Sequence, residues 1–305
     1  MSKNLLFLLL LFLGVIITLL MYNTSLQKND LDLEIKILKP ISPSDSVEFI
    51  SQIQESWNFH TKKIYDDFLD QSALQSSNFN ADTLFNAQVI RIIRRDNIDE
   101  ELLQLSKYQN LEALSFVECK FSNTQFEELI EVLKNKKHFK KLMISHSNIK
   151  SIPKNIFKLK FLETLGLDHN RLTTINDEIK LLSNLKYFGV KGNKSLKKLT
   201  KQIGELRSLE ILNISGCSID SIPNSIGQCI ALKTLSANSG KLEYVPNSIE
   251  NCQKLINLNL GHNQISNLPS RIGSLKNLGM LSISHNPYDS IPVSYKNLKN
   301  LFHFN

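Results

Sequence analysis

Apolar residues recur along this chain in a fixed unit of about 23 residues. In the segment Leu162-Glu-Thr-Leu165-Gly-Leu167-Asp-His-Asn170-Arg-Leu172, apolar side chains occupy positions 1, 4, 6 and 11, and an asparagine occupies position 9. Positions 4 and 6 alternate as in a short half-buried strand. One such unit is too small to bury its leucines alone, so we expect neighbouring units to stack on one another. The units start at residues 111, 139, 162, 185, 209, 232, 255, 278 and 301, after an earlier copy through Ile90 and Ile92.

The second half of the unit repeats as well. It reads Ile-Pro-x-x-Ile or a close variant, as in Ile222-Pro223-Asn-Ser-Ile226-Gly227 and Leu268-Pro269-Ser-Arg-Ile272-Gly273. The whole unit resembles the 23-residue class of leucine-rich repeats, LxxLxLxxNxLxxIPxxIGxLxx, which is familiar from bacterial and Ras-group repeat proteins. The resemblance covers residues 87–305. It implies an α/β solenoid, a horseshoe with parallel strands on its concave side, and an asparagine ladder in which the ninth side chain binds neighbouring backbone groups.

Some units depart from this pattern. Ser147 and Gly240 occupy the ninth position and are expected to weaken the ladder locally, whereas Cys119 and Cys217 are accepted substitutes there. The 28-residue unit lacks the proline, and Phe126, Leu129, Ile130 and Leu133 follow helical spacing, which predicts a true convex helix. A one-residue insertion in the turn Asn193-Lys-Ser-Leu196 accounts for the single 24-residue spacing.

The first 23 residues form a hydrophobic segment. Leu5 to Met21 carries no charge, and as a helix it would be roughly 25 Å long, at the short end of what crosses a bilayer. No small-residue cleavage site follows, which favours an uncleaved membrane anchor over a signal peptide that is removed to release a secreted protein. The positive flank at Lys3 predicts that the repeats lie outside the cytoplasm.

Residues 24–44 and 45–86 separate this segment from the repeats. Pro40 and Pro43 favour a tether over residues 24–44. In residues 45–86, Phe49, Ile53 and Trp57 recur at helical spacing, which predicts a short helical cap over the first repeat.

Charge is divided unevenly along the chain. Residues 87–305 hold 30 Lys and Arg against 19 Asp and Glu, a balance of +11, whereas residues 1–86 hold 6 against 10, a balance of −4. The basic repeats favour an anionic partner such as lipid head groups, acidic glycans or acidic protein. A general Lys-rich composition explains the same excess without any partner. Lysines at 134, 136, 137, 140 and 141 form the densest basic patch, whose simplest interpretation is a solvated face.

The candidate chemistry is sparse. Cys119, Cys217, Cys229 and Cys252 form no disulfide framework, although Cys229 and Cys252 are one repeat apart, so a core role and a disulfide both remain open. Two histidine pairs share a column, His146 with His169 and His262 with His285. The predominant interpretation is that these histidines are exposed turn residues that bind nothing; a metal site is the alternative. No phosphate-binding loop, nucleophile elbow or zinc-hydrolase motif occurs.

We therefore predict a non-enzymatic scaffold without a cofactor or metal, which binds a protein through its concave face while held at a membrane. Binding of anionic lipid or glycan by the basic repeats is the alternative, and an enzyme within residues 24–86 is a second rival. Nucleic acid is excluded because aromatic interleaving is absent. A monomer is expected, with end-to-end dimerisation at Leu301–Phe304 as the alternative. The concave column positions give these candidate contact residues: Glu163, Asp168, Lys186, Tyr187, Lys191, Asn213, Lys233, Asn238, Asn257, Asn259 and His262.

Overall fold

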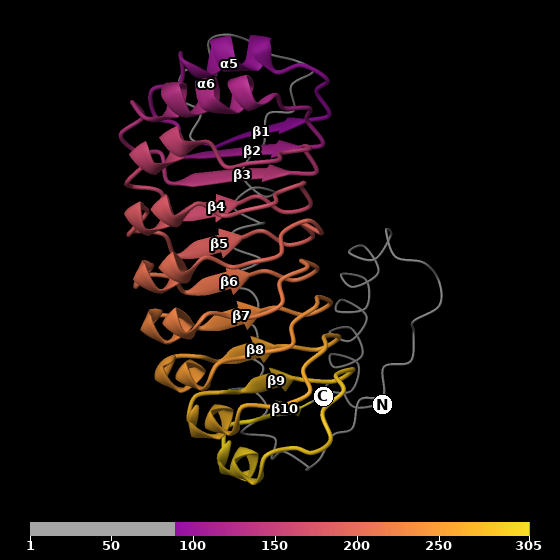
Figure 1. The fold of residues 1–305 in the computed structure, drawn as a ribbon. Helices are drawn as coiled ribbons and strands as arrows, with labels where there is room; N and C mark the ends of the chain where they lie inside the picture. Colours follow the sequence, from indigo (N-terminus) through magenta and orange to yellow (C-terminus); the bar gives the residue numbers. More distant parts are fainter. Residues whose placement is uncertain (1–88, 305) are drawn as a thin grey trace, which may run out of the picture. The chain divides into compact units, whose positions relative to one another are not determined.

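A computed structural model of the chain describes residues 89–304. Ten strands form a single parallel sheet in which the strand order is the sequence order, β1 to β10 (Figure 1). This is the solenoid that the repeat predicts, with one strand contributed by each unit. The strands are β1 (Val89–Ile93), β2 (Ala113–Val117), β3 (Lys141–Ser145), β4 (Thr164–Gly166), β5 (Tyr187–Gly189), β6 (Ile211–Asn213), β7 (Thr234–Ser236), β8 (Asn257–Asn259), β9 (Met280–Ser282) and β10 (His303–Phe304).

The strand register follows the repeat register. Leu142 pairs with Leu165, and Leu165 pairs with Phe188, so equivalent positions of successive units lie side by side. Their side chains point into the solenoid, where Leu165 and Phe188 have no measurable exposure. Because the unit length is nearly constant, these side chains stack into one continuous core that runs the length of the repeats.

The opposite wall of the solenoid consists of short helices. Two α-helices come first, and one five-residue 3-10 helix follows in each later unit (Figure 1). They are α5 (Asp99–Leu105), α6 (Asn123–Leu133), η2 (Lys154–Lys158), η3 (Asp177–Leu181), η4 (Lys201–Glu205), η5 (Asn224–Gln228), η6 (Asn247–Asn251), η7 (Ser270–Ser274) and η8 (Val293–Asn297).

Helix α6 is the convex helix predicted for the 28-residue unit. Its first turn is closed by a capping box, in which the Ser122 hydroxyl accepts the Gln125 N–H and the Gln125 side chain accepts the Ser122 N–H. Its inward face buries Phe126, Leu129, Ile130 and Leu133. The same wall contains α5, which the sequence pattern did not predict and which turns Leu102 and Leu105 into the core.

Proline and glycine shape the 3-10 helices. A proline precedes five of them and fixes the extended entry of the chain; Pro223 has φ −69° and ψ 150°. At Gly227 a Cβ atom would lie 2.5 Å from the Ser248 carbonyl oxygen, so only glycine lets η5 and η6 approach this closely. Gly204 and Gly273 meet the following unit in the same way.

The predictions for the N-terminal part, an anchor at 1–23, a tether at 24–44 and a helical cap at 45–86, lie outside the described residues. Within residues 89–304, the helices are too short and too polar for any of them to traverse a bilayer.

Candidate functional site

The turn that follows each strand has an unusual backbone conformation. The eighth position of the unit has a φ between 53° and 74° in nine consecutive units, from Arg94 to His285. Glycine adopts this left-handed region without steric strain, whereas the region is energetically unfavourable for other residues. Gly192 and Gly216 fit this requirement, and their presence in the column is the sequence signal that could have revealed it. The turns therefore present histidine, serine and charged side chains from a fixed backbone.

The predicted asparagine ladder is formed behind these turns. The Asn170 Oδ1 accepts the backbone N–H groups of Ser147 (3.0 Å) and Ile149 (3.1 Å), while its Nδ2 donates to the Ile144 carbonyl at 2.7 Å. One side chain thus satisfies three groups of the preceding unit. Asn193, Asn263 and Asn286 act in the same way.

Cysteine and serine maintain part of this ladder. The Cys217 thiol donates to the Val190 carbonyl at 3.2 Å, and the Ser147 hydroxyl accepts the Cys119 N–H at 3.2 Å. Ser147 therefore weakens the ladder less than its side-chain size suggests. Gly240 contributes no side chain to the ladder, as predicted.

All four cysteines are free and buried. Cys229 and Cys252 each donate a thiol hydrogen bond to a carbonyl of the preceding unit, at 3.2 and 3.3 Å, instead of bonding to each other. Burial raises the pKa of each thiol to about 12, which keeps both protonated. The arrangement makes them structural residues rather than reactive ones.

An ion-pair ladder runs along the second position of the units. Glu163 lies between two lysines, with 3.2 Å to the Lys140 Nζ and 2.8 Å to the Lys186 Nζ. Farther along, the Lys233 Nζ lies 2.9 Å from the Glu210 carboxylate. The pKa of Lys186 is raised, mainly by its hydrogen bond to Glu163. Three predicted contact residues, Glu163, Lys186 and Lys233, are thus already paired within the protein.

Lys140 and Glu210 complete this ladder, and the sequence interpretation missed both. The available signal was the strict alternation of sign in one column. In sequence order that column reads Lys140, Glu163, Lys186, Glu210 and Lys233.

Tyr187 differs from the expectation. It was predicted as an accessible contact, yet it is 7% exposed. Its ring covers the next strand position, since a Cβ on Gly189 would lie 2.5 Å from the Tyr187 hydroxyl. A glycine is also covered on β4, where Met143 of the neighbouring strand β3 lies over its paired residue Gly166. Large side chains lean over glycines here, so the column assignment alone overestimated exposure.

Asparagine amides occupy the concave side of β6 and β8. Asn213 Oδ1 accepts the Ser215 N–H at 3.2 Å, and Asn259 Oδ1 accepts the Gly261 N–H at 3.2 Å. Each amide is thereby oriented, while its Nδ2 has no hydrogen-bond acceptor within residues 89–304. Asn257, two residues before Asn259 on the same strand, makes no side-chain hydrogen bond in that part of the chain. All three are half-buried.

Asp168 and Lys191 come together at the seventh position. The Asp168 carboxylate accepts the backbone N–H of Lys191 at 2.8 Å. Burial raises the pKa of Asp168 to about 6, and the hydrogen bond from Lys191 opposes this rise. The pKa of the adjacent His169 is lowered to about 4, first by burial and then by the charges of His146, Lys191 and Lys194. Two units further, Asn238 accepts the Ser215 hydroxyl at 2.8 Å.

Both histidine pairs are stacked. The rings of His146 and His169 lie 4.4 Å apart and those of His262 and His285 lie 4.0 Å apart, each with 9° between the planes. A metal ion shared by two imidazoles must lie in the plane of both rings, and these planes are nearly parallel. In residues 89–304, no group of three or more His, Cys, Asp and Glu side chains is arranged to hold a metal ion. The stacked rings therefore do not form a chelating pair.

The lysine patch at 134–141 is not a uniform basic surface. Lys136 is buried, and its ammonium donates to the Ser106 carbonyl at 2.8 Å; burial lowers its pKa. Lys134 pairs with Glu131, and Lys140 belongs to the ion-pair ladder. Structure-forming contacts thus account for much of this charge.

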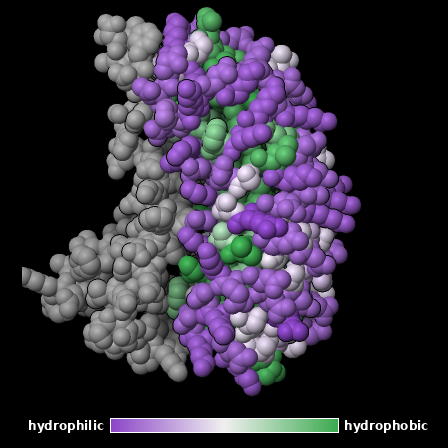
Figure 2. Space-filling model, turned by 90° about the vertical axis from the view of Figure 1, so that its left-hand side faces the viewer, coloured by the Kyte–Doolittle hydropathy of each residue, from purple (hydrophilic) through white to green (hydrophobic). Residues whose placement is uncertain are grey.

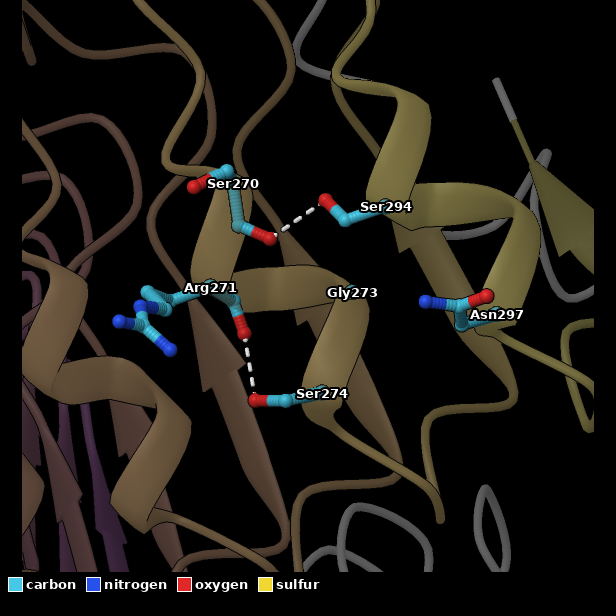
Figure 3. A pocket seen from close by; sticks show the side chains of 6 residues that line it. All are labelled: Ser270, Arg271, Gly273, Ser274, Ser294 and Asn297. Carbon is cyan, nitrogen blue, oxygen red and sulfur yellow. Dashed lines mark hydrogen bonds between the residues drawn. The ribbon is translucent and has the colours of Figure 1, made fainter.

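A shallow hollow of about 360 Å³ lies between η7 and η8 (Figure 3). Within it the Ser294 hydroxyl donates to the Ser270 carbonyl at 2.7 Å, and the Ser274 hydroxyl donates to the Arg271 carbonyl at 2.8 Å. The side of the solenoid that carries the short helices is mostly hydrophilic, with small separate hydrophobic patches (Figure 2). The hollow between η7 and η8 is thus open and polar, and no broad apolar surface is visible among the described residues of this side.

Comparison with protein families agrees with the repeat. A model described as "Leucine rich repeat" matches residues 137–194, and one described as "Leucine-rich repeat region" matches residues 174–263. An adenylate cyclase of Schizosaccharomyces pombe is 35% identical over 81 residues, which cover 27% of this chain and 5% of that protein. The chain thus spans a small fraction of this relative.

Several solved structures share the fold. The ectodomain of the Arabidopsis thaliana receptor kinase GASSHO1/SCHENGEN3, in complex with CASPARIAN STRIP INTEGRITY FACTOR 2, superposes with a TM-score of 0.59 at 22% identity, covering 72% of this chain and 27% of that one. The plant peptide hormone receptor RGFR1 with RGF2 gives 0.57 at 23%, covering 72% and 35%. A TLR13–ssRNA13 complex gives 0.58 at 20%, covering 72% and 32%. At these identities the likeness establishes the fold.

Proposed function

Because the chain is a leucine-rich-repeat protein of the 23-residue class, we propose that it is a non-enzymatic scaffold that binds a partner protein through its concave face. The proposal places the contact on β6 to β8 and their turns. The side chains of the ion-pair ladder and of the histidine stacks already contact one another, and Met143 and Tyr187 cover the glycines of β4 and β5. The proposed contact surface lies beside these groups.

The observation that carries the proposal is the set of oriented amides on β6 and β8. Asn213 and Asn259 present Nδ2 donors whose direction is already fixed by their own turns. Thr234, Ser236 and Ser282 add half-buried hydroxyls in the same columns. Groups of this kind bind the backbone of an extended polypeptide, and a preformed surface lowers the ordering cost of association. The two plant receptors whose complexes share this fold lend support by analogy.

A photo-crosslinking experiment tests the proposal. A benzophenone amino acid replaces Asn257 on the concave side of the full-length chain, and Asn247 on the helical side in a matched control. We expect position 257 to crosslink a defined polypeptide, and Asn213→Asp combined with Asn259→Asp to reduce that yield several-fold. Crosslinks that form only from position 247, or that persist unchanged in the double variant, would rule out the concave amides as the binding surface.

We also propose that residues 5–21 hold the protein in a membrane with the repeats outside the cytoplasm. The support is the uncharged run and the absence of a cleavage site after it. We expect the full-length protein to remain in the membrane fraction after high-salt and carbonate washing, with an intact N-terminus by mass spectrometry. A soluble product that starts near residue 25 would show instead that the segment is a cleaved signal.

Binding of an anionic surface is the second candidate function. The balance of +11 over residues 87–305 favours it. The turns after β3 to β5 support this candidate better than the lysine patch at 134–141, where Lys136 is buried and Lys134 and Lys140 form ion pairs.

A further inference from the structure

Five cationic residues lie in the turns that follow β3, β4 and β5. These turns leave the ends of the strands marked by the arrowheads (Figure 1). We call these residues the basic edge. All five are exposed, and none of them forms an ion pair within residues 89–304, unlike the lysines of the ion-pair ladder. The basic edge consists of Lys150, Arg171, Lys194, Lys197 and Lys198.

Backbone contacts between units place these residues side by side. The Arg171 N–H donates to the Ile149 carbonyl at 2.8 Å, which sets Arg171 beside Lys150. The neighbouring Leu172 N–H donates to the Asn193 side chain at 2.9 Å, which sets Arg171 beside Lys194. Units in a parallel sheet are about 5 Å apart, so the backbones of Lys150, Arg171 and Lys194 follow one another at roughly that interval along the edge.

The inserted residue of the 24-residue unit enlarges this cluster. Lys194 and Ser195 form an extra turn between Asn193 and Leu196, after which Leu196 returns to the core with no exposure. Lys197 and Lys198 follow directly. The 24-residue unit thus carries three of the five cations.

Two acidic residues, Asp177 and Asp220, bind hydroxyl groups and form no ion pair with the cations of the basic edge within residues 89–304. The Thr200 hydroxyl donates to the Asp177 carboxylate, and the Ser221 hydroxyl donates to the Asp220 carboxylate at 2.7 Å. Like charges about 5 Å apart repel one another and favour an anionic ligand. The lowered pKa of His169, to which Lys194 contributes after burial, is consistent with a positive potential here.

Hydroxyl groups are interspersed among the cations, whereas apolar groups are buried. Ser151, Thr173, Thr174 and Ser195 are exposed and make no side-chain hydrogen bond within residues 89–304. The apolar residues of the same turns, Leu172, Leu196 and Leu199, are buried. Among the described residues of these turns, the exposed side chains are polar, and none is an apolar side chain that could insert into a lipid layer.

We propose that the basic edge binds an acidic polysaccharide that runs along the turns of units three to five. Its carboxylate or sulfate groups match the lysines and Arg171, and its hydroxyls match the serine and threonine side chains. This site is distinct from the concave amides, and it stands whether or not those amides bind a protein.

The test measures binding of a fluorescent heparin octasaccharide to the full-length protein by anisotropy. Lys194→Gln, Lys197→Gln and Lys198→Gln are combined in one variant. The matched control combines Lys254→Gln, Lys276→Gln and Lys299→Gln, three exposed lysines outside the edge that form no ion pair in the described residues. Both variants lose three charges, so long-range attraction falls equally in the two.

We expect the edge variant to bind about tenfold more weakly, since each exposed ionic contact contributes a modest part of the affinity, and the control to change less than about twofold. The parent should lose affinity as salt rises from 50 to 300 mM, as roughly expected for screened charges. Equal losses in both variants would overturn the site. Tighter binding to phosphatidylglycerol vesicles or to poly-glutamate than to the octasaccharide would overturn the ligand class. Thermal melting of both variants is the control that they remain folded.

Discussion

One ladder side chain serves two units at once. Asn263 accepts the Leu242 N–H at 3.0 Å and donates to the Ala237 carbonyl at 2.8 Å, so its loss leaves buried backbone groups without partners. We expect Asn170→Leu and Asn263→Leu each to lower the free energy of unfolding by about 1–3 kcal/mol. Denaturant titration of the full-length chain measures this change.

The matched control for the ladder is Asn267→Leu. Asn267 is exposed, and its amide donates only to the neighbouring Ser266 hydroxyl. Its replacement should stay within about 0.5 kcal/mol. If the ladder variants unfold at the same denaturant concentration as Asn267→Leu, the ladder bonds do not support the turns. Asn238, which the sequence predicted to be exposed, is unsuitable as the control because it is half-buried and its side chain accepts a hydrogen bond from the Ser215 hydroxyl.

Asp168 and His169 make opposite contributions to the pH dependence of stability. The pKa of Asp168 is raised to about 6 from 3.8, so the folded protein holds the extra proton in that window, and this contribution falls as pH rises through it. The pKa of His169 is lowered to about 4 from 6.5, so its contribution is complete above that window and is lost as pH falls. Between about pH 4 and 6 the two effects offset each other.

Single replacements should separate these two contributions. In Asp168→Asn the His169 effect remains, so we expect the melting temperature to fall more steeply than in the parent as pH drops from 6.5 to 4. In His169→Asn the Asp168 effect remains, so melting should fall less steeply or rise over the same range. Asparagine also tolerates the left-handed backbone at position 169. Parallel pH profiles for the parent and both variants would show that neither group titrates as described.

At the scale of the element, the close contact of successive 3-10 helices depends on glycine. An alanine at position 227 would bring its Cβ within 2.5 Å of the Ser248 carbonyl oxygen, which is backbone and cannot rotate away. We expect Gly227→Ala to destabilise by about 1–3 kcal/mol. Lys180 occupies the same place in η3 and is exposed, so Lys180→Ala should stay within about 0.5 kcal/mol. Equal effects of the two changes would mean that η5 and η6 can move apart freely.

The elements differ in how far sequence predicts them. The strands, their register and α6 follow from apolar spacing, because inward side chains must stack on their equivalents in the next unit. Helix α5 was missed because its apolar pair, Leu102 and Leu105, is too short a pattern to distinguish from a loop. The 3-10 form of the later helices depends on close approach between units, which no single unit encodes.

The candidate site was less predictable than the fold. Column positions placed the eleven predicted residues on the concave side and its turns, but they did not say which side chains would pair with each other. Glu163 and Lys186 of neighbouring units bind one another, because cross-strand contacts depend on side-chain length as well as register. Tyr187 lies over Gly189 of its own strand, because the glycine leaves room for the ring. The basic edge was overlooked because its five cations come from three separate units.

At the scale of the whole molecule, each unit is stabilised by the units beside it, so a unit at the edge of the described sheet has fewer neighbours within residues 89–304. At the C-terminal edge of the described sheet, β10 pairs with β9, His303 with Met280 and Phe304 with Leu281. Leu298 is buried and Leu301 packs partly against the core, whereas Phe302 and Phe304 are 37% and 38% exposed. Leu298 and Leu301 thus cover the core of the unit that contains β9, an arrangement that we call a minimal cap.

Hydrogen exchange can test this cap, because loss of the cap should destabilise only the units next to it. Leu301→Asp places a charge against the core beside β9, so we expect amide exchange in η7 and β9 of the full-length protein to accelerate on the order of tenfold, while β4 and β5 stay unchanged. Lys299→Asp, an exposed replacement two residues away, should leave exchange at the parental rate in all units. Acceleration that spreads evenly over all units would show that the solenoid unfolds as one block. If Phe304→Asp alone slows sedimentation from a dimeric to a monomeric rate, the exposed phenylalanines join two molecules end to end, and the minimal-cap interpretation fails.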